Sequence, residues 1–213
     1  MTRILPGVLA MATIVVASNI LVQFLILDGF LTWGAFTYPL AFLVTDIMNR
    51  AYGVSAARKV VFSGLVVGII CSLIGSQIML QGDGFTYPAV ALRIAIASAT
   101  AFGVAQLLDI AVFNRLRQGS WWKAPLGSTL VSSTVDTAIF FSIAFASVFN
   151  GFSAAAADEV IWAQDAVPFL SAGPLVPLWV SLAVADWGVK LGIALIALVP
   201  FRIIVGRLQQ ANT

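Results

Sequence analysis

Long apolar runs alternate with short polar breaks along the whole chain. Six of the runs are long enough, at about 20 predominantly apolar residues, to cross the hydrocarbon core of a bilayer as an α-helix. The pattern therefore predicts an all-α membrane protein, a single domain in which a six-helix transmembrane bundle takes up the 213 residues. The expected spans are about 4–27, 30–49, 60–80, 89–113, 126–150 and 173–201.

The composition agrees with this class and excludes several functions. Charged residues make up 9% of the chain, against roughly 25% in an average soluble domain. Eleven Lys and Arg are too few and too dispersed for a nucleic-acid surface. The chain has no histidine, and Cys71 is its single cysteine, which excludes histidine catalysis, an intrachain disulfide and a multi-cysteine metal site. We expect neither an enzyme nor a cofactor or metal.

The basic residues indicate the orientation of the spans. Nine of the eleven fall at alternate breaks between the spans, and the charged residues of the other breaks are all acidic. By the positive-inside rule, both termini are expected on the cytoplasmic side of a bacterial inner membrane. The outer segment 151–172 is expected to form a lid or a short re-entrant stretch. The acidic residues of the outer breaks are Asp28, Asp83, Asp158, Glu159 and Asp165.

Six charged residues lie within the predicted spans. Each costs about 2.5–3.5 kcal/mol near the bilayer centre, so such a residue marks a functional site by default. At about 1.5 Å per residue, three of them lie near the midplane, one lies near the outer boundary and two lie near the inner one. The midplane residues are Asp136, Asp186 and Lys190; Arg93 is the outer one, and Asp46 and Asp109 are the inner ones. We interpret Asp109 as a structural partner of the basic loop at 115–123.

A polar stripe follows the fifth span, where Ser128, Ser132, Asp136 and Phe140 repeat every four residues. Residues at this spacing share one helix face, which must point into the bundle. Packing of helices through small hydroxylated residues accounts for the serines. The aspartate at the midplane favours a ligand or ion site.

The sixth span places Trp179, Asp186 and Lys190 on one face, and Asp186 and Lys190 are spaced to pair. A structural ion pair and a ligand site with Trp179 as a stacking platform both fit this spacing. Arg93 is expected to contact a ligand, to pair with Gln77 at similar depth, or to extend outward.

The second span contains Phe36-Thr37-Tyr38-Pro39. Only about 16 Å of helix separates Pro39 from Arg50, so the helix must begin before the motif and be kinked or broken near Pro39. Interrupted helices at the midplane are typical of transport sites, and Phe36 and Tyr38 favour an aromatic-lined pocket. The following Asp46, Asn49 and Arg50 are expected to form an inner gate or a structural latch, with Asp46 and Arg50 spaced to pair.

These motifs resemble the VUT or queuosine precursor transporter family. The resemblance rests on residues 36–53 and 57–61, on residues 131–145 around Asp136, and on Lys190 and Pro200. It implies import of 7-cyano-7-deazaguanine and 7-aminomethyl-7-deazaguanine for tRNA queuosine salvage, without an ATPase subunit. It also implies a fold related to the substrate-binding components of energy-coupling-factor transporters. Among the family's shared residues it places Tyr38, Asp46, Asn49, Arg50 and Asp136.

The chemistry of these residues is compatible with a small planar nucleobase-like substrate. One carboxylate can accept hydrogen bonds from a ring N–H and an exocyclic amine, and aromatic rings can stack on the faces. The expected acceptor is Asp136 or Asp186, with stacking by Phe36, Tyr38 or Trp179, and with Arg93 or Gln77 reaching the carbonyl. A flavin- or pterin-like vitamin importer and a structural membrane protein are the competing interpretations. The driving force and a homodimeric assembly stay open.

Overall fold

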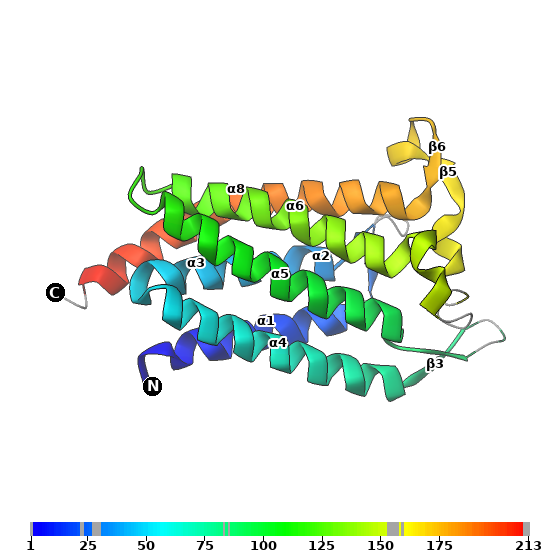
Figure 1. Ribbon diagram of the computed structural model, residues 1–213, viewed down its shortest axis with the longest axis horizontal. Coiled ribbons are helices and arrows are strands. Elements are labelled where there is room, and N and C mark those ends of the chain that lie inside the picture. Colours follow the sequence, from blue (N-terminus) through cyan, green and yellow to red (C-terminus); the bar gives the residue numbers. More distant parts are fainter. Residues whose placement is uncertain are drawn as a thin grey trace.

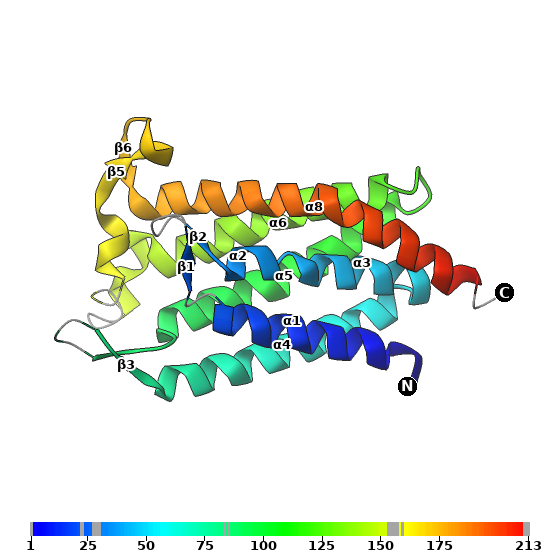
Figure 2. The same ribbon diagram turned by 180° about the vertical axis from the view of Figure 1, so that it is seen from behind.

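The computed structural model describes residues 2–21, 24–26, 31–82, 84, 86–152, 158 and 160–210. Helices dominate this part of the chain and run roughly along one long axis (Figure 1). The helix α1 begins and the helix α8 ends at the same end of the bundle, and the short β-hairpins lie toward the other end (Figures 1 and 2). We name these the terminal end and the hairpin end.

Four helices are long and apolar enough to cross a membrane, by length and composition: α4, α5, α6 and α8. The apolar α1 is shorter, with 17 residues. The helices are α1 (Leu5–Leu21), α2 (Gly34–Thr37), α3 (Leu40–Tyr52), α4 (Val54–Gln77), α5 (Leu92–Leu116), α6 (Lys123–Phe145) and α8 (Leu178–Gln210).

Three antiparallel two-stranded hairpins and several 3-10 turns complete the described part of the chain. The 3-10 turns are η1 (Thr2–Ile4), η3 (Ser147–Phe152), η4 (Ile161–Gln164) and η5 (Phe169–Ser171). The hairpins pair β1 (Leu25–Ile26) with β2 (Leu31–Thr32), β3 (Met79–Gln81) with β4 (Thr86–Pro88), and β5 (Ala166–Pro168) with β6 (Leu175–Pro177).

The helix boundaries differ from those of the predicted spans, and two of the differences have a clear local cause. The helix α4 begins at Val54, directly after Gly53 with φ +86°, so Arg58 and Lys59 lie on the helix rather than in a loop. The helix α8 begins at Leu178 rather than at Gly173 because the preceding residues pair with β5. The length of an apolar run indicates how much of the chain can lie in a membrane. The helix itself begins and ends where its backbone hydrogen bonds begin and end, so its boundaries can differ from those of the run.

The chain between α2 and α3 keeps helical backbone angles but changes its hydrogen bonding. Tyr38 and Pro39 both have right-handed helical φ and ψ. The amide of Ala41 bonds to the carbonyl of Tyr38, and the amide of Phe42 bonds to that of Pro39, in three-residue turns. Proline has no amide proton to continue the four-residue ladder. The two helices therefore follow one another with an interruption at the Phe-Thr-Tyr-Pro motif.

The helices pack closely around the bundle interior. The contact between α5 and α6 is the most extensive one, and α1 lies against α4. A Cβ on Gly64 of α4 would lie 2.5 Å from the Cγ of Met11, so only glycine permits this approach of α1. Near the terminal end, Phe113, Phe201 and Val205 join α5 to α8.

The distribution of polarity is the reverse of that in a soluble protein. Large apolar side chains cover the outside of α4 and α8; Phe62 is 66% exposed and Ile196 is 71% exposed. Polar and charged side chains are buried inside the bundle, next to clusters of apolar core residues. The outer acidic residues Asp158 and Asp165 are exposed, whereas Asp28, Asp83 and Glu159 lie outside the described residues. The buried polar side chains include Thr45, Asp46, Asn49, Gln106, Asp109, Ser128, Ser132, Asp136 and Lys190.

Candidate functional site

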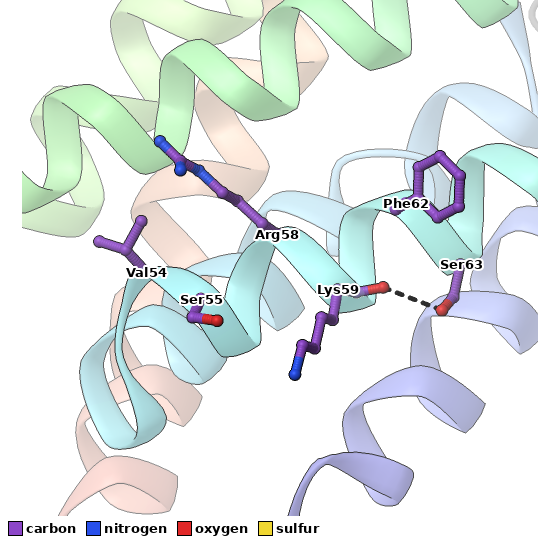
Figure 3. Close-up of a pocket in the computed structure, with 6 residues that line it drawn as sticks. All are labelled: Val54, Ser55, Arg58, Lys59, Phe62 and Ser63. Carbon is purple, nitrogen blue, oxygen red and sulfur yellow. Dashed lines mark hydrogen bonds between the residues drawn. The ribbon is translucent and has the colours of Figure 1, made fainter. Parts of the chain in front are cut away.

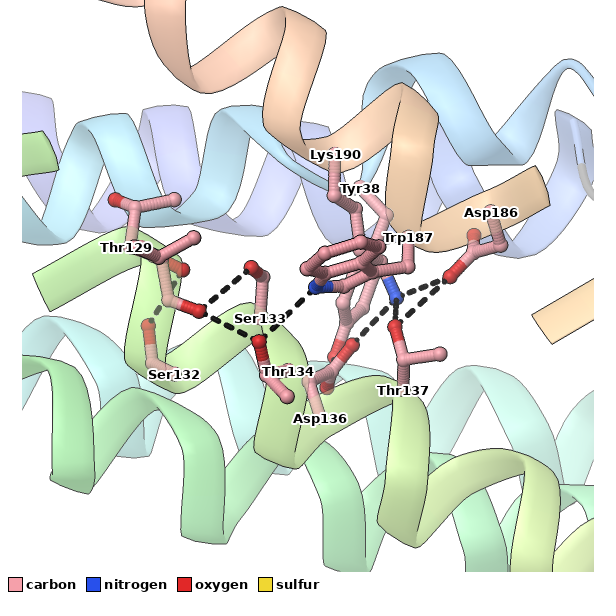
Figure 4. A network of polar contacts seen from close by, with 11 residues as sticks. Tyr38, Thr129, Ser132, Ser133, Thr134, Asp136, Thr137, Asp186, Trp187 and Lys190 are labelled. Carbon is pink, nitrogen blue, oxygen red and sulfur yellow. Dashed lines mark hydrogen bonds and ion pairs between the residues drawn. The ribbon is translucent and has the colours of Figure 1, made fainter. Parts of the chain in front are cut away.

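The ammonium group of Lys190 is the centre of a polar cluster between α6 and α8. Its Nζ lies 2.7 Å from Oδ2 of Asp136 and 2.6 Å from Oδ2 of Asp186. It also donates a hydrogen bond of 3.0 Å to the hydroxyl of Thr137, which in turn donates to Asp186. Figure 4 shows these side chains converging from the two helices. We name Lys190, Asp136, Asp186, Thr137 and Tyr38 the Lys190 cluster.

Tyr38 brings the interrupted helix into the cluster. Its hydroxyl donates to Oδ1 of Asp136 at 3.3 Å, and its ring centroid lies 5.6 Å from Nζ of Lys190. The residue lies between α2 and α3, where helical backbone angles continue without the regular ladder. The Phe-Thr-Tyr-Pro motif thus places an aromatic ring and a hydroxyl against the buried charges of α6 and α8.

The predicted inward stripe of α6 is confirmed, since Ser128, Ser132 and Asp136 are all buried. The predicted i, i+4 ion pair of Asp186 with Lys190 is also confirmed. One ammonium faces two carboxylates, so the ionised cluster carries one net negative charge. Because Lys190 is only 4% exposed, its charge depends on these two acids for compensation.

A second polar layer lies about one helical turn along α6 from Asp136, toward the terminal end. In this layer the carboxyl groups of Asp46 on α3 and Asp109 on α5 both face the serine stripe of α6. Ser128 donates to Asp46 at 3.3 Å, and Ser132 donates to Asp109 at 2.9 Å. We name Asp46 and Asp109 the carboxyl pair. Local spacing along the chain does not predict this pair, because Asp46 and Asp109 lie on helices that are far apart in the sequence.

The expected pairing of Asp46 with Arg50 is wrong. Arg50 donates instead to the backbone carbonyl of Arg117, just beyond the end of α5, at 2.6 Å. A helix C-terminus offers carbonyls without partners, which attract a cation. Asp109 likewise makes no ion pair with the basic loop, because its carboxyl group faces Asp46 inside the bundle.

Asn49 and Thr45 connect α3 to α5 beside the carboxyl pair. Asn49 donates to the carbonyl of Ile110 at 3.2 Å, and Thr45 donates to Oε1 of Gln106 at 2.6 Å. Asn49 and Arg50 thus hydrogen-bond from α3 to backbone carbonyls within α5 and just beyond its end.

Arg93 and Gln77 lie apart from the Lys190 cluster. Arg93 donates to the carbonyls of Ile143 and Ala146 and to Oδ1 of Asn150, so that it closes the C-terminal end of α6. Gln77 is exposed at the end of α4 and bonds to the neighbouring Ser76.

The two remaining aromatic candidates lie on the edge of the bundle interior. Trp179 is half-buried against an apolar cluster that contains Ala97, Phe141 and Ala144. Phe36 is 37% exposed and contacts the ring of Trp33, with centroids 6.1 Å apart. Of the aromatic candidates, Tyr38 is the one that contacts the charged residues.

Two cavities lie at different positions relative to the two polar layers. A wide, open hollow of about 620 Å³ lies on the surface of α4, where Arg58, Lys59 and Phe62 line it (Figure 3). A small cavity of about 10 Å³ lies inside the bundle against Asp46, Pro39 and Thr129. That space holds about one water molecule. Among the described residues, no three His, Cys, Asp or Glu side chains gather as a metal site.

Comparisons with known proteins agree with a transport role. A family model described as "Putative vitamin uptake transporter" matches residues 32–205. The "Probable queuosine precursor transporter" of Haemophilus influenzae is 37% identical over 194 residues, covering 85% of this chain and 73% of that protein. The "Queuosine precursor transporter" of Escherichia coli is 40% identical over 141 residues, covering 62% and 64%. No solved structure matches.

Proposed function

The chain belongs to the vitamin uptake transporter family, and from this premise we propose that it imports queuosine precursors, 7-cyano-7-deazaguanine and 7-aminomethyl-7-deazaguanine, for tRNA queuosine salvage. Its relatives named as queuosine precursor transporters support this assignment. The observation that carries the proposal is the buried Lys190 cluster, in which an interrupted helix contacts a charged layer inside an apolar bundle.

We propose six transmembrane spans in one domain, with both termini in the cytoplasm and the bacterial inner membrane as the location. Besides the four long helices, α1 with its 17 residues and the consecutive α2 and α3 supply the other two spans. At 1.5 Å per residue, a helix of 17 residues reaches about 26 Å, close to the hydrocarbon thickness. The concentration of Lys and Arg toward the terminal end supports the orientation.

Within the Lys190 cluster, Asp186 is the best-placed carboxylate for a substrate. Both oxygens of Asp136 already have partners, Tyr38 at Oδ1 and Lys190 at Oδ2. Among the described residues, Lys190 and Thr137 contact Asp186 at Oδ2, and its side chain is 16% exposed. A deazaguanine presents a ring N–H beside an exocyclic amine, which one carboxylate can accept together. The Tyr38 ring supplies an aromatic surface nearby.

The net negative charge of the cluster also suits these substrates. A ring N–H, an exocyclic amine and the cationic aminomethyl group of 7-aminomethyl-7-deazaguanine are all attracted to negative charge. In a low-dielectric interior this attraction is stronger than in water. We propose that Asp136 holds Lys190 and Tyr38 in place while Asp186 binds the purine-like edge.

Uptake in cells that cannot make or import the precursors tests this function. Wild-type protein should restore queuosine in tRNA when either deazaguanine is supplied, and Asp136→Asn and Asp186→Asn should each abolish that recovery. Asp165→Asn, which changes an exposed acid at the hairpin end, is the matched control and should behave as wild type. Membrane abundance of each variant must be measured in parallel. Full uptake by both cluster variants would refute the site.

The description of the matching family keeps a vitamin importer as the second candidate function. In that case the protein would be the substrate-binding component for a flavin- or pterin-like ligand and would co-purify with an energising subunit. A thermal-shift screen of deazaguanines against flavins and pterins separates the two, because a ligand of the folded state raises the melting temperature.

A further inference from the structure

The carboxyl pair is buried without a compensating cation. Asp46 is 2% exposed and Asp109 is fully buried. Ser128 donates to Asp46, and Ser132, one turn along α6, donates to Asp109, so the two carboxyl groups lie beside each other among neutral donors. The pair therefore differs from Asp136 and Asp186, which share the ammonium of Lys190.

The charged residues of the neighbouring helices are engaged elsewhere. Among the described residues, none forms an ion pair with either member of the carboxyl pair. Arg50 on α3 bonds to a carbonyl, and Lys190 on α8 and Asp136 on α6 bond to each other. Those toward the terminal end are Arg58 and Lys59 of α4, Arg115 of α5, Lys123 of α6, and Arg202 and Arg207 of α8.

Two carboxylates in contact cannot both stay ionised in a buried, apolar setting. A proton on one of them turns the repulsive contact into an O–H···O hydrogen bond and leaves a single negative charge, which the two serines solvate. Two buried carboxyl groups held by successive serines of one helix face, without a cation, are thus the expected setting for a shared proton.

Polar atoms around the pair have hydrogen-bonding capacity to spare. In the part of the chain that the structure describes, Oδ1 of Asn49, Nε2 of Gln106 and Oδ2 of Asp109 are buried and have no hydrogen-bond partner. Asn49 lies one turn after Asp46 on α3, and Gln106 lies one turn before Asp109 on α5. The small cavity beside Asp46 has room for about one water molecule. The carboxyl pair thus has an unpaired oxygen of its own at Asp109 and, at Asp46, a space that a small ligand can occupy.

We propose that Asp46 and Asp109 bind one exchangeable proton and that this proton is coupled to substrate movement through the Lys190 cluster. The coupling rests on the proposed transport function; the proton site does not. Ser132 and Asp136 are one turn apart on α6. A change in the charge of the carboxyl pair therefore changes the electrostatic potential at the Lys190 cluster. Loss of the proton adds a second negative charge and strengthens the attraction for a cationic or hydrogen-bond-donating ligand.

Infrared spectroscopy of the purified, reconstituted chain tests the proton site without any substrate. At neutral pH we expect a C=O stretching band of a protonated carboxyl that shifts in deuterated water. The band should be absent from the Asp46→Asn/Asp109→Asn double variant and present in Asp165→Asn. The absence of such a band from the wild type would overturn the proposal, and so would its removal by sodium chloride, which would indicate a sodium site.

Transport in proteoliposomes tests the coupling. Because the proton and the substrate oppose each other, an outward proton gradient should accelerate uptake of 7-aminomethyl-7-deazaguanine several-fold in the wild type, and the double variant should lose this acceleration while the substrate still raises its melting temperature. Wild-type uptake that ignores the gradient would overturn the coupling and leave the transport function intact. Failure of every deazaguanine to bind the wild type would instead refute the proposed function, while the infrared result would stand.

Discussion

Two neighbouring layers along α6 hold the same acidic side chain under different conditions. At Asp136, the carboxylate lies 2.7 Å from an ammonium and also accepts from a tyrosine hydroxyl. One turn away, Ser132 donates to Asp109, which shares its layer with Asp46 and forms no ion pair among the described residues. The first layer is stabilised by opposite charge. The second layer requires either a bound proton or a cation from outside the chain.

The difference separates fixed charge from exchangeable charge. Lys190 cannot leave its helix, so the Lys190 cluster keeps its negative excess and can offer that excess to a ligand. A proton on the carboxyl pair can leave, so the charge of that layer can change during a transport cycle. Substitutions that alter charge and shape separately can distinguish the two layers.

Removal of the shared cation should have the largest effect. Lys190→Met leaves Asp136 and Asp186 buried without compensation, which costs about 3–5 kcal/mol of folding free energy. Thermal unfolding of detergent-solubilised protein measures this loss. Lys123→Met, at the exposed start of α6, is the control and should change stability by less than about 0.5 kcal/mol. Equal melting temperatures for the two variants would show that the acids do not depend on the ammonium.

Neutralisation of one acid in the same cluster should cost less. Asp136→Asn keeps the shape of the side chain but weakens a charge-assisted hydrogen bond, and Lys190 retains Asp186. A loss of about 1.5–3 kcal/mol is expected. Combined with Lys190→Met in a double-mutant cycle, the two changes should be non-additive by about 0.5–3 kcal/mol. Strict additivity would mean that the two side chains do not interact.

The chain could be interpreted correctly wherever a local pattern determines the structure. The four-residue repeat of Ser128, Ser132 and Asp136 predicts their inward face, and the spacing of Asp186 and Lys190 predicts their ion pair. Helix periodicity alone determines both results.

Local patterns of this kind do not predict contacts between helices. The pairing of Asp46 with Arg50 was expected because it is local, but α5 and α6 supply nearer partners for both residues. Arg93 closes the end of α6 through carbonyls, and no sequence pattern marks a carbonyl as an acceptor. One feature of the sequence does point to the carboxyl pair. The serine stripe of α6 continues from Asp136 to the depth of Asp46 and Asp109, which indicates one continuous polar face.

Removal of a single hydroxyl tests how Tyr38 contributes to the Lys190 cluster. Tyr38→Phe deletes the 3.3 Å hydrogen bond to Asp136 and keeps the ring near Lys190. We expect a loss of about 1–1.5 kcal/mol in thermal unfolding, at the low end for a hydrogen bond to a charged group because the contact is long. Tyr52→Phe, at the other end of α3 and half-buried against the core, is the matched control. A melting temperature of Tyr38→Phe equal to that of the wild type would show that the hydroxyl of Tyr38 is dispensable.

The smallest effect is expected at the carboxyl pair. If one proton is shared, Asp109→Asn replaces a neutral carboxyl with a neutral amide that can still donate to Asp46, so the charge and the hydrogen bond both persist. The expected change is below about 0.5 kcal/mol, less than one net hydrogen bond. Asp109→Ala removes the donor as well and should cost about 1–3 kcal/mol, because the carboxylate of Asp46 is left buried with one fewer partner. A penalty for Asp109→Asn as large as that for Asp136→Asn would mean that the second layer, like the first, depends on a fixed ionised acid, and the contrast between the two layers would disappear.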